Sequence, residues 1–151
     1  ASDWQTQIVS YRLVGDIKYA AQQIIDCAHS TSPTGKQLLI WGGETTVELS
    51  GDGRGGRNQE LAVRVAALAG DLSGQWLFLS GGTDGRDGPT DAAGGIVTAE
   101  TISRSQSSNV NVQAALTAND SYRILDAAGD LLKTGATGTN VADIQLLFRT
   151  N

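Results

Sequence analysis

The most restrictive feature of this chain is a glycine-rich stretch, GGETTV at residues 42–47 followed by GRGGRNQE at residues 53–60. Glycines contribute no side chain to a core, but they tolerate positive φ and let the backbone approach another group closely. Arg54 and Arg57 stand where a helix is predicted to begin, and the first amide groups of a helix point outward as free donors. The stretch therefore predicts a site for an anion, most simply a phosphate or a carboxylate.

Length and composition narrow the class of protein. The chain has 151 residues, 40% of them hydrophobic and 18% charged, which is typical of one soluble globular domain. A net charge of -5 argues against nucleic acid or an anionic membrane surface as partner, and no apolar run reaches the roughly 18 residues of a membrane helix. The single cysteine, Cys27, cannot form an internal disulfide, so the cytoplasm is the simplest compartment.

The chain begins at Ala1 and contains no methionine. We therefore expect a fragment, a processed form or a renumbered chain rather than a complete translation product.

Hydrophobic spacing predicts strands that alternate with helices. Strands are expected at 8–13, 37–41, 45–50, 76–79, 96–97 and 144–148, helices at 16–28, 57–69, 112–117 and 121–128, and a surface loop or poor helix at 101–111. This alternation predicts an α/β fold, a single domain with a mixed, largely parallel sheet flanked by helices. Residues 1–36 are expected to form an N-terminal strand–helix segment that leads into a domain at 37–151, with the whole chain packing as one unit.

Residues 51–56, GDGRGG, satisfy the G-x-G-x-x-G pattern of dinucleotide sites, and Asp71 follows about 20 residues later. The pattern is weak in a chain with 19 glycines, and the strand predicted before it alternates instead of being apolar on both faces. The two arginines suit the separate oxygens of a phosphoryl group or a carboxylate. A glycine turn with solvated arginines is the simpler alternative.

Two further loops carry polar groups. Residues 80–95 follow the most strand-like run, and Asp84, Asp87 and Asp91 in this loop could hold Mg²⁺ through one or two carboxylates and water. Capping of turns and of a helix start is an equally good use for these aspartates. Residues 134–140 bring hydroxyl groups and free amides that could form an anion-binding concavity, or only a turn.

Several common catalytic patterns are absent from the sequence. There is no G-x-x-x-x-G-K-[ST] and no G-x-S-x-G. Cys27 and His29 lie two residues apart on a predicted helix and so point to different faces, which leaves a His/Cys metal site unsupported.

Taken together, five motifs resemble the MOFRL domain, which forms the C-terminal part of the type-2 glycerate kinases, some of them labelled hydroxypyruvate reductases. The motifs are GGETTV (42–47), GRGGRNQE (53–60), GTDGRDGPTDAAGGIV (82–97), NDSY (119–122) and TGATGTNVADI (134–144). The resemblance runs in order over about residues 37–148. One departure is Ala136, where the family usually has proline.

This resemblance implies ATP-dependent phosphorylation of D-glycerate at its 2-hydroxyl group, giving 2-phosphoglycerate, with Mg²⁺ and in the cytoplasm. It also implies an active site in a cleft, completed by an N-terminal Rossmann-like domain that supplies an essential lysine. Phosphoryl transfer depends on positioning all partners together, so the isolated chain is expected to have little or no turnover.

The resemblance also assigns roles to residues of this chain. Arg57, as a charge clamp, Glu44 and Asp84 are the expected catalytic residues, and Asp84 and Asp87 are the expected metal ligands. Substrate or phosphate binding is expected from a larger group of loop residues, namely Arg54, Gly55, Gly56, Asn58, Thr83, Thr137, Thr139 and Asn140.

Two other functions stay open at this point. One is an NAD(P)H-dependent hydroxypyruvate reductase built on the GDGRGG loop, for which His29 is the only obvious acid or base. The other is a non-catalytic fragment or binding module that exposes an apolar surface. A homo-oligomer is also left open.

Overall fold

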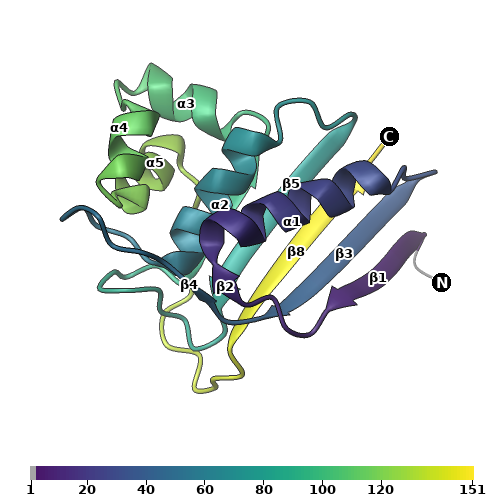
Figure 1. Ribbon diagram of the computed structural model, residues 1–151, viewed down its shortest axis with the longest axis horizontal. Helices are drawn as coiled ribbons and strands as arrows, with labels where there is room; N and C mark the ends of the chain where they lie inside the picture. The colour runs from purple at the N-terminus through teal and green to yellow at the C-terminus, as the bar shows by residue number, and fades with distance from the viewer. Residues whose placement is uncertain (1–2) are drawn as a thin grey trace.

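Strands and helices alternate along residues 3–151, the part of the chain that the computed structural model describes (Figure 1). In chain order the elements are β1 (Trp4–Ser10), β2 (Gly15–Asp16), α1 (Ile17–Ser30), β3 (Lys36–Gly43), β4 (Thr45–Thr46), α2 (Arg57–Leu68), β5 (Gln75–Gly82), β6 (Gly94–Thr98), α3 (Thr101–Ser107), α4 (Val112–Thr117), α5 (Ser121–Ala128), β7 (Leu131–Leu132) and β8 (Asp143–Thr150). None of these helices combines the length and the apolar composition needed to cross a membrane.

The main sheet has the strand order β1-β3-β8-β5-β6-β7, and β2 pairs with β4 separately. The expected α/β class and the mixed sheet are confirmed. The expectation of a largely parallel sheet is wrong, because within the main sheet only β1–β3 is parallel and the other four strand pairs are antiparallel. The physical reason is that β8, the last strand of the chain, inserts between β3 and β5 and is antiparallel to both.

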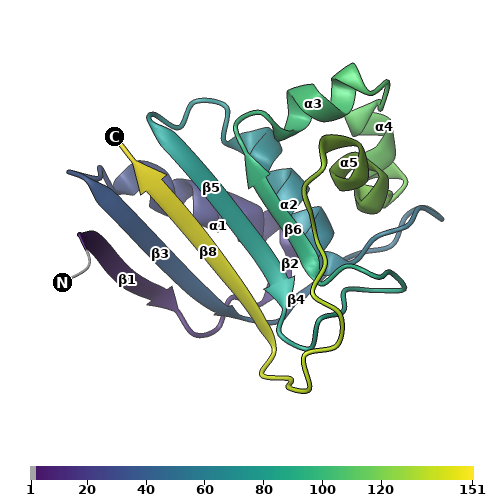
Figure 2. The same ribbon diagram turned by 180° about the vertical axis from the view of Figure 1, so that it is seen from behind.

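The helices cover one face of this sheet. Helices α1 and α2 lie side by side over it, and α3 and α5 pack against α2 (Figure 1). Helix α1 turns an apolar stripe to the sheet, and every residue of that stripe is buried: Ile17, Ala20, Ala21, Ile24, Ile25 and Ala28. Strand β1 is part of the main sheet through its pairing with β3, and the buried side chains of α1 are part of the same hydrophobic core as those of the later elements. Figure 2 shows the opposite face of the sheet, with no helix in front of its central strands.

Three local expectations differ from the structure. The first strand lies at 4–10 rather than 8–13, and residues 101–107 form a regular helix where a loop or poor helix was expected. The expected strand at 45–50 is limited to Thr45 and Thr46, because the chain after them leaves the ladder. Its backbone is held instead by Asn119, whose Oδ1 accepts hydrogen bonds from Ser50 N at 2.7 Å and Gly51 N at 3.0 Å.

The backbone at Gly51 and Gly53 packs closely against another loop of the protein, at residues 118–120. Gly53 N donates to Ala118 O at 2.7 Å, and a Cβ on Gly53 would lie 2.6 Å from Asp120 Cβ and in closer conflict with Ala118 O. A Cβ on Gly51 would lie 2.6 Å from Ala118 Cα. The glycine pattern here is therefore explained by packing of two loops. The strand before the dinucleotide pattern is only the two-residue β4, which is separated from Gly51 by residues 47–50.

We expect Gly53→Ala to lower the free energy of unfolding by about 1–3 kcal/mol, because the added methyl group forces the two loops apart. Urea denaturation followed by circular dichroism measures the change. Gly70→Ala is the matched control, since a Cβ there has nothing within 4 Å. Equal losses in the two variants would contradict this account of the loop.

Candidate functional site

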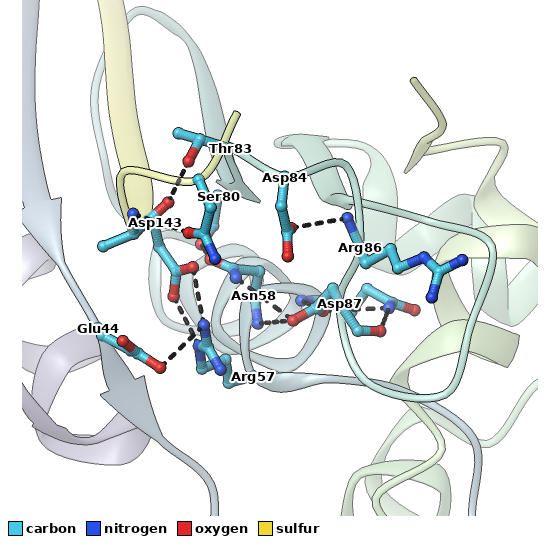
Figure 3. A network of polar contacts seen from close by, with 12 residues as sticks. Glu44, Arg57, Asn58, Ser80, Thr83, Asp84, Arg86, Asp87 and Asp143 are labelled. Atoms are coloured by element: carbon cyan, nitrogen blue, oxygen red, sulfur yellow. Dashed lines mark hydrogen bonds and ion pairs between the residues drawn. The ribbon is translucent and has the colours of Figure 1, made fainter. Parts of the chain in front are cut away.

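Loops that are distant in the sequence meet at one end of the sheet (Figure 3). The loop after β5 is tied to the loop before β8, since Thr83 Oγ1 donates to Ala142 O at 2.7 Å and accepts from Val141 N at 2.8 Å. Thr137 adds a backbone hydrogen bond to Asp84 O at 3.3 Å and donates its hydroxyl to Thr83 O. The loop between β5 and β6 (83–93), here called the aspartate-rich loop, and the loop between β7 and β8 (133–142), here called the threonine-rich loop, thus form one surface.

Arg57, the first residue of α2, points into this region and pairs with Asp143, the first residue of β8 (Figure 3). Its Nε donates to Asp143 Oδ2 at 2.6 Å and its Nη2 to Asp143 Oδ1 at 3.0 Å. Glu44 Oε1 lies 3.3 Å from Nη2. The hydrogen bonds to Asp143 raise the pKa of Arg57 further, although burial opposes this, so the guanidinium is a fixed cation.

Several donors beside this ion pair remain free. Arg57 Nη1 and the backbone N–H groups of Gly55, Gly56 and Arg57 donate to no residue between 3 and 151. Gly55, Gly56, Arg57 and Glu44 line a groove of about 770 Å³, a volume in the range of small-molecule sites. The groove therefore offers unsatisfied positive partial charges beside a full positive charge.

Asp87 accepts hydrogen bonds from the backbone N–H groups of the second and third residues of α2, Asn58 and Gln59. Its Oδ1 accepts from Asn58 N at 3.0 Å and its Oδ2 accepts from Gln59 N at 2.8 Å. The side-chain amides of Asn58 and Gln59 also donate to this carboxylate, at 3.3 Å and 3.1 Å. Asp87 thus caps the helix, and it offers no free oxygen to the metal ion that it was expected to hold.

Asn58, expected to bind substrate, is fully buried. Its Nδ2 donates to Asp87 and its Oδ1 accepts from Ser80 Oγ at 2.7 Å. Both ends of the side chain are engaged inside the protein, so the structure gives Asn58 a role in holding α2 to β5.

Asp84 is the one aspartate of its loop that keeps a free oxygen toward the site. Oδ1 accepts from Arg86 N at 3.0 Å, and Oδ2 accepts from no residue within 3–151. No group of three or more His, Cys, Asp or Glu side chains suited to a metal ion is found in that range. A single carboxylate is nevertheless compatible with Mg²⁺, which is commonly held by one or two carboxylates with water and substrate phosphates.

Arg54 belongs to a separate surface cluster. Its guanidinium lies 4.1 Å from the centre of the Tyr122 ring and 4.0 Å from Asp91 Oδ1, and Lys133 Nζ lies 3.0 Å from Asp91 Oδ2. Asp91 therefore pairs with cations at the surface instead of joining Asp84. Arg54 and Arg57 are three residues apart, yet they serve different neighbours.

Thr139 and Asn140 lie on the exposed threonine-rich loop. Asn140 Oδ1 accepts from Ala142 N at 3.2 Å, which leaves its Nδ2 without a partner in residues 3–151. Thr139 N approaches Thr137 Oγ1 at 3.4 Å. This loop places several hydroxyl and amide groups beside Thr83 and Asp84, and none of its residues is among those that line the groove.

Sequence reasoning missed Asp143. It lies within the TGATGTNVADI motif, but no role was assigned to it. The available signal was an acid directly before a strand, which is common, and only the fold shows that it is buried opposite Arg57.

Burial raises the pKa of the Asp87 carboxyl, and its hydrogen bonds to Asn58 and Gln59 oppose this only in part. The folded chain therefore holds a proton on Asp87 at pH values where the unfolded chain has lost it. This contribution to the free energy of unfolding is complete below the unfolded-state pKa and is lost as the pH rises through the folded-state pKa.

The free energy of unfolding of the native chain, minus that of Asp87→Asn, should therefore fall as the pH is raised from about 3 to about 7. Urea denaturation of both proteins over this range measures the difference. A difference that grows with pH would mean that the hydrogen bonds to the carboxylate outweigh its burial, and it would contradict the raised pKa of Asp87.

Comparisons with known proteins agree on one family. A family model described as the MOFRL family matches residues 37–143. The human glycerate kinase is 50% identical over 124 residues, which are 76% of this chain and 23% of the human protein. The D-glycerate 2-kinase of Thermotoga maritima is 50% identical over 106 residues, 70% of this chain and 25% of that protein.

The fold agrees as well. The crystal structure of a glycerate kinase from Thermotoga maritima matches with a TM-score of 0.91 and 37% identity, over 98% of this chain and 37% of that one. This chain spans about a quarter of the length of these two curated relatives. Because the family model covers well over half of the sequence, this chain belongs to the MOFRL family.

Proposed function

We propose that this chain is the C-terminal domain of a glycerate 2-kinase, which transfers a phosphoryl group from ATP to the 2-hydroxyl group of D-glycerate and gives 2-phosphoglycerate. The observation that supports this best is the groove in which a held arginine, three free amide groups and Glu44 come together. Relatives named glycerate kinase and D-glycerate 2-kinase support the choice of reaction.

Arg57 is proposed to bind anionic oxygens of the phosphoryl group or of the glycerate carboxylate. Asp143 and Glu44 engage Nε and Nη2, so Nη1 is the atom left for the ligand. A cation held in place before the substrate arrives needs no reorganisation during the reaction, which is how enzymes stabilise developing charge. Gly55 and Gly56 would add backbone N–H groups to the same anion.

Glu44 and Asp84 supply the negative side of the proposed site. Glu44 is exposed and contacts Arg57 through one oxygen, so its other oxygen can accept a hydrogen bond from a substrate hydroxyl group. Asp84 is the residue that would hold Mg²⁺. The ion, when bound, would neutralise charge on the ATP phosphates.

The threonine-rich loop is proposed to bind substrate oxygens at the rim through Thr139 and Asn140. Thr83 and Thr137 are engaged with each other's loops and would act by positioning them. Arg54, held by Tyr122 and Asp91, is proposed as a second, outer cation for phosphate.

An N-terminal Rossmann-like domain that supplies a lysine is proposed to complete the cleft, in the cytoplasm. The part that this chain matches is 23% of one relative and 25% of the other, so each relative is about four times as long as that part and has room for such a domain. No observation favours the reductase alternative. Residues 47–50 separate the two-residue β4 from the GDGRGG loop, and His29 pairs with Asp71 at 3.2 Å at the exposed end of α1.

Titration of the ¹⁵N-labelled chain with 2-phosphoglycerate tests the anion site. The amide resonances of Gly55, Gly56 and Arg57 should shift, and Arg57→Ala should weaken binding about 10-fold or more, because it removes a charge-assisted hydrogen bond. Arg86→Ala is the matched control, since this exposed arginine lies on the neighbouring loop. Binding that Arg57→Ala leaves unchanged would remove Arg57 from the site.

Turnover tests the two-domain proposal separately. With ATP, Mg²⁺ and D-glycerate, a coupled assay of the 151-residue chain should show little or no activity. In a complete two-domain enzyme, the Arg57→Ala change should cost about 100-fold or more in rate, as loss of one preorganised donor typically does. Normal kinase rates from the chain alone would refute the need for a second domain.

A further inference from the structure

Residues 118–122 connect α4 to the first turn of α5, and the proposed function assigns no role to Asn119, Asp120 or Ser121. They contain the NDSY motif (119–122), one of the five motifs of the family resemblance. In the fold they lie against residues 50–54, which directly precede the free backbone N–H groups of the groove. We call residues 118–122 the supporting segment.

Hydrogen bonds join the supporting segment to this loop at successive positions. Gly53 N donates to Ala118 O at 2.7 Å. Arg54 N donates to Asp120 Oδ1 at 3.1 Å, and Arg54 O accepts from Tyr122 N at 2.9 Å. The backbone of the loop is thus held up to the residue directly before the free N–H groups.

Asn119 holds the earlier part of the same loop. Its Oδ1 accepts from Ser50 N at 2.7 Å and from Gly51 N at 3.0 Å, and its Nδ2 donates to Glu48 O at 3.2 Å and to Glu60 Oε2 at 3.0 Å. Asn119 is buried and is one of the residues that line the groove. Both ends of its amide group are engaged by the protein, so its role is to hold the loop.

Glu60 connects this arrangement to the helix that carries the candidate site. Its Oε1 accepts from Arg64 Nη2 at 2.7 Å, while its Oε2 accepts from Asn119. Glu60 is buried and lies three residues after Arg57 on α2. The supporting segment is therefore fixed relative to the helix on which Arg57 stands.

Close packing fixes the residues that carry the free N–H groups. A Cβ on Gly55 would collide with Ser121 Oγ, and a Cβ on Gly56 would lie 2.5 Å from Asp87 Oδ2. Gly55 thus lies against the supporting segment, and Gly56 lies against the carboxyl group that caps α2. Both glycines are held by their neighbours as well as by the chain on either side of them.

The backbone conformation of Asn119 does not explain why an asparagine is needed there. Its φ of 56° lies in the left-handed region, which asparagine tolerates and which glycine adopts more easily. Asn109 has a φ of 61° and occupies the same position after α3 that Asn119 occupies after α4. Asn109 is exposed, whereas Asn119 is buried and bonded to the loop and to α2.

We propose that Asn119 and Asp120 are positioning residues for the anion site, which keep the free N–H groups of residues 55–57 in place before the ligand arrives. This role rests on the proposed function, which takes the groove to bind an anion. Donors that are ordered in advance lose little conformational freedom on binding. A loop released from the supporting segment would have to be ordered by the ligand, so the affinity would fall.

Asn119→Gly tests this role directly, because it removes the side chain and suits the left-handed backbone. In the ¹⁵N-labelled chain, the backbone order parameters of Gly55 and Gly56 should fall from about 0.85 to below about 0.6. The dissociation constant for 2-phosphoglycerate should rise about 10-fold, since binding then includes the cost of ordering the loop. Asn109→Gly is the matched control and should change neither quantity.

Asp120→Ala and Asp120→Asn form a second pair of variants, which decides the matter if Asn119→Gly does not fold by circular dichroism. Both remove the same charge, but the amide oxygen introduced by Asp120→Asn can still accept a hydrogen bond from Arg54 N. Asp120→Ala should therefore bind 2-phosphoglycerate about 5-fold more weakly than Asp120→Asn. A residue that served stability alone would lower the midpoint of urea unfolding and leave the affinities of the folded variants equal.

Order parameters and an affinity that stay at wild-type values in folded Asn119→Gly would overturn this role and leave the proposed function intact. Equal binding by the two folded Asp120 variants would overturn it for Asp120. A wild-type chain that binds no 2-phosphoglycerate would refute the proposed anion site itself, and the positioning role with it.

Discussion

The ion pair between Arg57 and Asp143 is the constraint that organises this molecule. Asp143 starts the central strand β8 and is buried, and Arg57 starts α2, the helix in the middle of the helix layer. A buried carboxylate needs a charged or hydrogen-bonding partner, and loss of either member leaves the other uncompensated. The pair therefore fixes where α2 begins relative to the end of the sheet. Glu44, which follows directly after β3, also forms an ion pair with Arg57. Three segments that are far apart in the sequence are therefore held together at this arginine.

A second buried carboxyl group, that of Asp87, completes this arrangement. Asp87 takes the amide groups of Asn58 and Gln59, which are donors that a helix N-terminus would otherwise offer to a ligand. The donors that remain for an anion are therefore the backbone N–H groups of Gly55, Gly56 and Arg57 and the Nη1 group of Arg57. Gly51, Gly53 and Gly55 lie against residues 118–121, and Gly56 lies against Asp87. Of these glycines, Gly55 and Gly56 also line the groove with free amides. The GRGGRNQE motif thus packs against neighbouring loops through some of its residues and presents free N–H donors to the groove through others.

The two-layer fold separates two kinds of surface. Loops at the end of the sheet carry charge and free donors, whereas the strands present mainly aliphatic and aromatic side chains on the face turned away from the helices. Polar groups at the end of the sheet recognise small anions by direction and charge.

The sequence by itself determined most of the elements and the family. Apolar residues spaced three and four apart fixed α1 and α2, short apolar runs fixed β3, β5 and β8, and motif order pointed to the MOFRL family. It also indicated which loops hold the polar groups. Only the tertiary structure decided that β8 inserts antiparallel between β3 and β5, that Arg57 pairs with Asp143, and that Asp87 caps α2 while Arg54 turns to Tyr122. Periodicity reports contacts within a few residues, but the partner of a charge is chosen by segments dozens of residues away, once packing has brought them together.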